Sequence, residues 1–98
     1  MIIQIVRFTS ELDDAEVLRR YETRVERYRS VPGLVQKYYL RYPDGDHGAV
    51  YVWQNQEALN RFRDSVLART IAETYRVQRA AETITADVVL TLSGRRIS

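Results

Sequence analysis

The sequence lacks cysteine altogether and has little histidine or proline: one histidine and two prolines among 98 residues. The absence of cysteine excludes disulfides, thiol nucleophiles and thiolate metal sites. His47 is the sole histidine, so it alone could act as the histidine base that is common near neutral pH. Long apolar runs are also missing, because Gln4 and Arg7 interrupt the N-terminal isoleucines. This pattern excludes a membrane span or signal peptide there and predicts a cytoplasmic protein.

The overall composition is that of one ordinary globular domain. Hydrophobic residues make up 45% of the chain, charged residues 29%, and the formal net charge is +2. The basic residues are spread along the chain, and only Arg95-Arg96 form a local cluster. We therefore expect one domain over residues 1–94, followed by a flexible C-terminal tail over residues 95–98.

The alternation of apolar and polar residues predicts six elements. Strands have period two and helices period 3.6, and Gly/Pro-rich turns separate them. The expected elements are strands 1–9, 34–42, 49–53 and 83–92, and helices from residue 10 to about 29 and from 56 to about 75. We expect the second helix to break near Asp64-Ser65.

The first helix has a clear start and an amphipathic pattern. Ser10 is the predicted N-cap, with Asp13 in the capping-box position. The predicted buried stripe is Leu18, Tyr21, Val25 and Tyr28. Three arginines lie off this stripe and should be solvated: Arg20, Arg24 and Arg27.

The βαββαβ order predicts an α+β, ferredoxin-like fold: a four-stranded antiparallel sheet with two helices on one face. The first strand is apolar on both faces, however, so the other sheet face also needs a cover. A second identical chain could stack on it as a barrel-like homodimer, or nucleic-acid bases could stack on exposed aromatics.

The stretch Gly48–Phe62 runs from a strand directly into a helix. It combines Gly48 with Val50-Tyr51-Val52-Trp53 and then Glu57-Ala58-Leu59, after Pro32-Gly33-Leu34 upstream. This arrangement resembles the dimeric α+β barrel proteins, above all the antibiotic-biosynthesis-monooxygenase-like and YdhR-like groups.

The resemblance implies a homodimer, or a larger assembly of identical chains, with a small pocket between the helices and the sheet of each chain. Some members oxygenate aromatic, polyketide-like phenols with molecular oxygen and without metal or flavin, so no cofactor is expected. Other members degrade heme with an Asn, a Trp and a His. The corresponding positions here are Gln4, Phe62 and Ala72, and all three depart from that pattern.

The resemblance also suggests site residues, since the oxygenases hold a phenol with Trp, Tyr, Asn, Arg and His. The catalytic candidates are Arg7, His47, Tyr51 and Trp53. The candidates for binding a small aromatic substrate are Tyr21, Tyr38, Tyr39, Asn55 and Phe62. Asp44, Asp46 and His47 are too few to predict a metal site.

Each catalytic candidate also has a purely structural interpretation. His47 could be a solvated turn residue beside Asp44 and Asp46. Tyr51 and Trp53 share one strand face and could simply pack in the core. Arg7 could bind an anionic ligand or pair with Asp87 on the neighbouring strand.

Two other functions remain open. The chain could be a non-catalytic dimer, either structural or binding a small ligand. It could also be an RNA-recognition-type module, because His47–Trp53 loosely resembles the aromatic third strand of those modules. Nucleic acid is the less favoured partner, because the leading Lys or Arg of that motif is absent.

Overall fold

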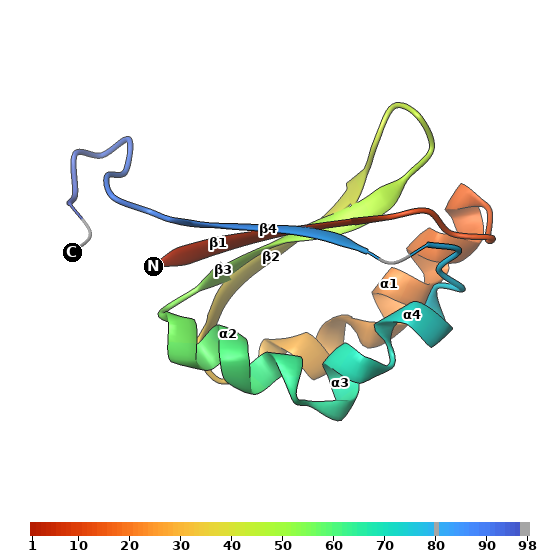
Figure 1. Cartoon of the computed structure of the whole chain (residues 1–98), viewed down its shortest axis with the longest axis horizontal. Coiled ribbons are helices and arrows are strands. Elements are labelled where there is room, and N and C mark those ends of the chain that lie inside the picture. The colour runs from red at the N-terminus through yellow and green to blue at the C-terminus, as the bar shows by residue number, and fades with distance from the viewer. Residues whose placement is uncertain (80, 97–98) are drawn as a thin grey trace.

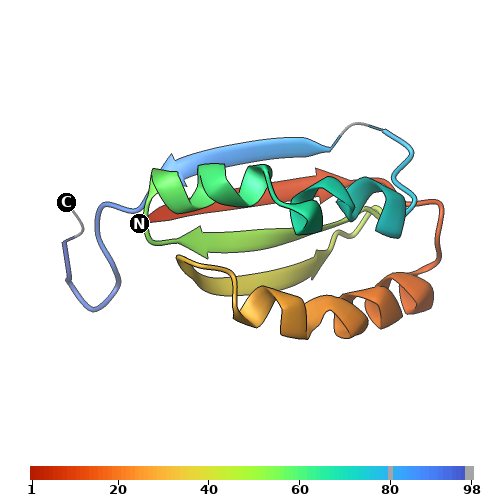
Figure 2. The ribbon, with the colours of Figure 1, turned by 90° about the horizontal axis from the view of Figure 1, so that it is seen from below.

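The computed structural model describes residues 1–79 and 81–96. A four-stranded sheet has the order β2-β3-β1-β4, with every neighbouring pair antiparallel. All helices lie on one face of this sheet, and the other face is open (Figures 1 and 2). The elements are β1 (Ile2–Phe8), α1 (Asp14–Arg29), β2 (Leu34–Arg41), β3 (His47–Trp53), α2 (Gln56–Arg63), α3 (Val66–Arg69), α4 (Ile71–Thr74) and β4 (Glu82–Asp87). The predicted α+β, ferredoxin-like architecture is confirmed.

The predicted break in the second helix is also confirmed. The backbone N–H of Asp64 caps the end of α2 on the carbonyl of Phe62. The Ser65 hydroxyl then accepts a hydrogen bond of 3.1 Å from the N–H of Ala68 and starts α3. The Ser65 hydroxyl also donates to the carbonyl of Phe62 at 2.6 Å, so this one short polar side chain bonds to the end of α2 and to the start of α3.

The predicted N-cap of α1 was wrong. Asp13 is the cap, and its carboxylate accepts from the N–H of Glu16 at 2.9 Å. The Ser10 hydroxyl instead donates to the carbonyl of Tyr75, and Ser10 forms a β-bridge with Val77. The reason is a long-range contact, which the local capping pattern does not contain.

The buried stripe of α1 differs from the predicted one. Its buried residues are Val17, Tyr21, Arg24 and Tyr28, whereas Leu18 is 56% exposed. The helix is therefore rotated by about one residue position, which turns Arg24 towards the interior. The expectation that Arg24 is solvated was wrong.

A β-bulge in β2 decides which side chains enter the interior. Leu34 pairs with Trp53, but Gln36 pairs with Val52 and Lys37 with Tyr51, so Val35 is the extra residue. A one-residue insertion reverses the faces of all residues that follow it. Lys37 and Tyr39 therefore face the helices, and Tyr38 faces the open side.

The last strand is shorter than the predicted 83–92. Strand β4 ends at Asp87, and the chain then leaves the sheet as an extended segment (Figure 1). Leu90 forms an isolated bridge with Arg96. Of the predicted tail 95–98, residues 97 and 98 lie outside the described residues. In the described part of the chain, no helix has the length and apolar character that crossing a bilayer requires.

Candidate functional site

An aromatic interior lies between α1 and the inner face of the sheet. Tyr51 packs within 6.2 Å of Tyr28, and Tyr21 within 4.7 Å of Tyr39 and 5.2 Å of Tyr75, measured between ring centroids. These residues come from α1, β2, β3 and the turn after α4. Their rings bring several hydroxyl groups to one region of the interior.

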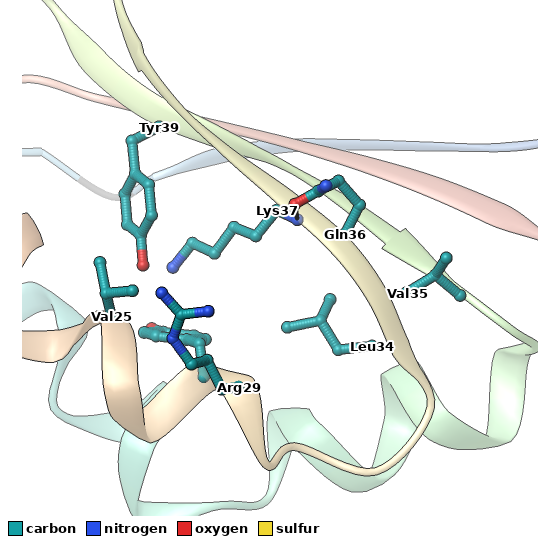
Figure 3. Close-up of a pocket in the computed structure, with 8 residues that line it drawn as sticks. Val25, Arg29, Leu34, Val35, Gln36, Lys37 and Tyr39 are labelled. Carbon is teal, nitrogen blue, oxygen red and sulfur yellow. Dashed lines mark hydrogen bonds between the residues drawn. The ribbon is translucent and has the colours of Figure 1, made fainter.

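Two neighbouring spaces adjoin this interior. An outer pocket of about 400 Å³ opens between the C-terminal half of α1 and the edge strand β2 (Figure 3). A small inner cavity of about 20 Å³ lies deeper, between the helices and the sheet. Lys37 and Tyr28 line both spaces and so stand at the boundary between them.

Lys37 is the most unusual residue of this region. Its side chain extends from β2 towards α1, into the space that Tyr39 and Arg29 also approach (Figure 3). Its Nζ lies 3.2 Å from the ring centroid of Tyr28, 4.4 Å from that of Tyr39 and 4.6 Å from that of Tyr51. Burial lowers the pKa of Lys37 to about 6, and the nearby Arg24 charge adds to this.

Three tyrosine hydroxyls in this interior make no hydrogen bond of ordinary geometry among residues 1–79 and 81–96, although the Tyr28 hydroxyl lies near that of Tyr51. We call them the open hydroxyls; they belong to Tyr28, Tyr39 and Tyr75. Burial raises the pKa of Tyr39 to about 12 and also raises the pKa of Tyr75, so both remain protonated donors at neutral pH. Buried polar groups are normally paired, so these hydroxyls are candidates to bind a ligand.

Arg24 supplies a fixed positive charge at the back of this region. Its guanidinium donates to the hydroxyl of Thr74 at 2.7 Å and to the carbonyl of Leu67 at 2.8 Å. These bonds tie α1 to α3 and α4. Arg24 is 7% exposed, and its charge therefore acts in a poorly solvated environment, where electrostatic interactions are stronger.

Three of the predicted site residues gather here: Tyr21, Tyr39 and Tyr51. The hydroxyl of Tyr21 lies 3.2 Å from the carbonyl oxygen of Leu40 and 3.1 Å from that of Gly48, so it holds α1 against β2 and β3. Tyr21 thus offers its ring rather than its hydroxyl to a ligand. Tyr51 is buried on the inner face of β3 and lines the inner cavity.

Trp53 and Phe62 form the core behind the cavity. Trp53 is 0% exposed, and its indole N–H donates to the side-chain oxygen of Gln4 at 2.9 Å. It stacks on Tyr51 with ring centroids 5.8 Å apart. Phe62 packs 5.9 Å from Tyr28. Both residues support the tyrosines from behind, and the pockets described above are lined by other residues.

His47 is not a solvated turn residue, as one interpretation of the sequence expected. It is the first residue of β3, is 4% exposed and packs 6.3 Å from the ring of Phe8. Its Nε2 lies 2.9 Å from a carboxylate oxygen of Asp14. His47 lines a separate pocket of about 580 Å³ near the start of α1, away from Lys37.

The remaining candidates lie elsewhere. Arg7 forms ion pairs with Asp44 and Asp46 of the β2–β3 loop, while Asp87 lies opposite Ile2, so the predicted pair with Asp87 was wrong. Tyr38 and Asn55 are exposed. Tyr38 lies on the open sheet face. Asn55 caps α2, because its side chain accepts a hydrogen bond of 2.9 Å from the N–H of Ala58.

Comparison with known proteins used both sequence and structure. No family model matches the sequence, and no curated protein matches it. Solved structures do align well, among them the three that follow. SnoaB, a cofactor-independent oxygenase from Streptomyces nogalater, has 21% identity and a TM-score of 0.74, over 93% of this chain and 95% of that one. An antibiotic biosynthesis monooxygenase has 17% identity and a TM-score of 0.73, over 91% and 99%. Rv0793 from Mycobacterium tuberculosis has 14% identity and a TM-score of 0.74, over 93% and 97%.

The chain has the fold of these three solved structures. At these identities the likeness establishes the fold, and the resemblance drawn from Pro32-Gly33-Leu34 and Val50–Trp53 is confirmed at that level. The same geometry removes the basis for the RNA-recognition alternative. Tyr51 and Trp53, which would have to stack bases, are buried under the helices at 3% and 0% exposure.

Sequence reasoning missed two residues at the centre of the candidate site, namely Arg24 and Lys37. A signal for Arg24 exists, because Tyr21, Arg24 and Tyr28 follow helical spacing. Lys37 has no such signal, since its inward direction depends on the bulge. In the described residues, no cluster of three or more His, Asp or Glu side chains could hold a metal ion.

Proposed function

We propose that the protein is a small monooxygenase that oxidises an aromatic, polyketide-like phenol without metal or flavin, and that the outer pocket holds this substrate. The observation that carries the proposal is that Tyr28 and Tyr39, whose hydroxyls are open, line one outer pocket together with Lys37, and that the charge of Arg24 lies near Lys37. The oxygenase activity of the structural neighbour SnoaB supports the same class of reaction.

The site offers what such a reaction requires. Aromatic rings form walls for a flat substrate, hydroxyl donors can stabilise a developing oxyanion, and the charge of Arg24 favours negative charge nearby. For an anthrone, the methylene carbon becomes a carbonyl: one atom of O₂ enters the product, and the other leaves as water with the two hydrogens. Electrons therefore balance between the substrate and O₂, and no external reductant is needed.

Oxygen consumption with anthrones and quinols tests this proposal. We expect uptake of one O₂ per anthrone converted by the wild-type protein. Tyr39→Phe and Tyr28→Phe should each lower kcat, by about 10² for a lost oxyanion donor. Tyr42→Phe is the matched control, because Tyr42 lies at the end of the β2 edge near Arg7, outside the pocket.

The result of this assay also separates the alternatives. If no phenol in a broad panel supports oxygen uptake above the buffer rate, the proposed activity is wrong. Binding of an aromatic ligand without oxygen uptake would favour the non-catalytic ligand-binding dimer instead.

We also propose that a second copy of the chain covers the open sheet face. Six apolar side chains line the middle of this face: Ile3, Ile5, Tyr38, Val50, Val52 and Ile84. Tyr38 is 56% exposed and Ile84 is 65% exposed. A continuous apolar band of this kind on a soluble protein usually marks an association surface. This homodimer would leave both helix–sheet pockets on the outside of the barrel.

A further inference from the structure

Lys37 is the only lysine of the chain, since all other basic residues among the 15 lysines and arginines are arginine. The difference matters chemically. An arginine keeps its charge at any physiological pH, whereas a buried lysine amine can lose its proton and act as a base. A cation that can give up its proton, unlike the arginines, is thus placed at the boundary between the pocket and the cavity.

The groups around the amine come from every element packed against it. From α1 they are Arg24, Tyr28 and, at the pocket mouth, Arg29; Tyr39 comes from β2, Tyr51 from β3, and Tyr75 follows α4. None is a carboxylate. Within the described part of the chain, Lys37 takes part in no ion pair, and Arg29 is paired with Glu26.

This environment favours the neutral amine until an anion arrives. Burial and the Arg24 charge both lower the pKa of Lys37, to about 6, so the lone pair is available at neutral pH. Once an anion lies beside it, the ammonium form gains an ion pair, and the ring faces of Tyr28, Tyr39 and Tyr51 also favour a cation. The neutral amine of Lys37 is therefore favoured in the empty pocket, and the ammonium form is favoured when an anion is bound.

We propose that Lys37 is the base of this pocket and that its amine takes the hydroxyl proton of a bound phenol, which is then held as a phenolate. The O–H bond of the phenol breaks, an N–H bond forms at Nζ, and the two charges remain side by side. No proton leaves the complex. The inference rests on the phenol pocket of the proposed function and assigns its base to Lys37 rather than to His47, which lines a different pocket.

The open hydroxyls complete this site. Tyr28 and Tyr39 have hydroxyls without partners in the described residues and line the outer pocket together with Lys37. A phenolate oxygen can accept from both hydroxyls and from the new ammonium, and hydrogen bonds to charged groups are the stronger ones. A neutral phenol offers one fewer lone-pair direction and no charge, so binding favours the ionised form.

The test uses 3-nitrophenol as the probe, because its phenolate absorbs at longer wavelength than its phenol. At a pH where the free probe is mostly protonated, we expect the wild-type protein to bind it with the phenolate spectrum. Titration calorimetry in buffers of different ionisation enthalpy should show no net proton release. In Lys37→Arg, the fixed cation can still hold the phenolate, but about one proton per bound probe must then go to solvent.

Two further variants complete the comparison. Lys37→Met should lose the phenolate spectrum, with at least a tenfold loss of affinity. Arg27→Met removes an exposed charge from the other side of α1 and should bind the probe as the wild type does. In wild-type protein labelled with ¹⁵N-lysine, the single Nζ signal should change from amine to ammonium when the probe is added. This last measurement does not depend on any variant folding.

Four results would overturn the assignment of Lys37 as the base. The wild type could fail to bind the probe, or could bind it as the neutral phenol. It could also release a proton when the phenolate forms, or leave the Nζ signal unchanged. Oxygen uptake is measured separately. Phenolate binding without oxygen uptake supports Lys37 as the base and rejects the monooxygenase activity, while oxygen uptake unchanged in Lys37→Met supports the activity and rejects the base.

Discussion

The half-buried amine of Lys37 should make the stability of the protein depend on pH in a way that a single substitution removes. The pKa of this group is lowered from 10.5 to about 6 in the folded state. Between these values the unfolded chain binds one proton more than the folded chain, so the free energy of unfolding rises with pH. Each pH unit corresponds to about 1.4 kcal/mol, which gives about 3 kcal/mol between pH 7 and pH 9.

This change in the free energy of unfolding is an upper limit, for two structural reasons. Nζ lies over the faces of three tyrosine rings, which favour the ammonium form and reduce the slope. Lys37 also lines an outer pocket that opens to solvent, and water there solvates the charge. Even at about half this size, the rise in the free energy of unfolding with pH should be measurable between pH 7 and pH 9. The buried tyrosines, whose pKa values are raised, change the pH dependence only above pH 10.

Urea unfolding of the wild type and Lys37→Met, followed by circular dichroism at several pH values from 6 to 9, measures this effect. We expect the wild type to become more stable as the pH rises and Lys37→Met to show little change. Lys37→Met should also be the more stable protein at pH 7, because it removes an amine that has to give up its proton on folding. Arg27→Met is the control and should keep the wild-type slope, since Arg27 is exposed.

Parallel curves for the wild type and Lys37→Met would refute this reasoning. They would mean that the amine has the same proton affinity in the folded and unfolded chain. The proposal that Lys37 accepts a proton from a phenol would then lose its physical basis, although the fold would be unaffected.

Three other predictions concern the hydroxyls, the sheet and the open face. Tyr21→Phe should destabilise the protein by about 2 kcal/mol in urea unfolding, because the Tyr21 hydroxyl is hydrogen-bonded to the backbone. Tyr39→Phe should stay within about 0.5 kcal/mol of the wild type, because the Tyr39 hydroxyl has no partner in the described residues. Equal losses of stability in the two variants would contradict this prediction. Gly48→Ala would place a Cβ 1.9 Å from a carbonyl oxygen of β1. We therefore expect the free energy of unfolding to fall by about 3 kcal/mol or more in the same assay. An unfolding midpoint equal to that of the wild type would disprove the close packing. Ile84→Asp should convert the proposed dimer to monomer in light scattering, while Thr85→Asp, on the other face of β4, should not; a wild type that is monomeric at high concentration would argue against the dimer.

Much of the fold follows from local patterns in the sequence. The alternation in β1 places Ile2, Val6 and Phe8 on one face and Ile3 and Ile5 on the other, as found. The break between α2 and α3 follows from the short polar residues that cap the two helices. These features depend on neighbours a few residues apart, so a sequence pattern contains them.

The candidate site was predicted only in part, because its residues depend on contacts between distant segments. Tyr39 and Tyr51 were identified as aromatic residues of neighbouring strands, but the face that Tyr39 occupies follows from the bulge at Val35. Arg24 is buried because oxygen atoms of Leu67, Thr70 and Thr74 meet its guanidinium, about 45 residues further along the chain. Neither the bulge nor these partners can be recognised from local spacing.

The sequence by itself determined the order of the elements, the break in the second helix and the aromatic inner face of β3, because apolar period and capping residues act locally. Only the tertiary structure decided that the sole lysine points into the aromatic interior. The register between β2 and β3 sets that direction, and strand register is a property of two paired strands rather than of either strand alone.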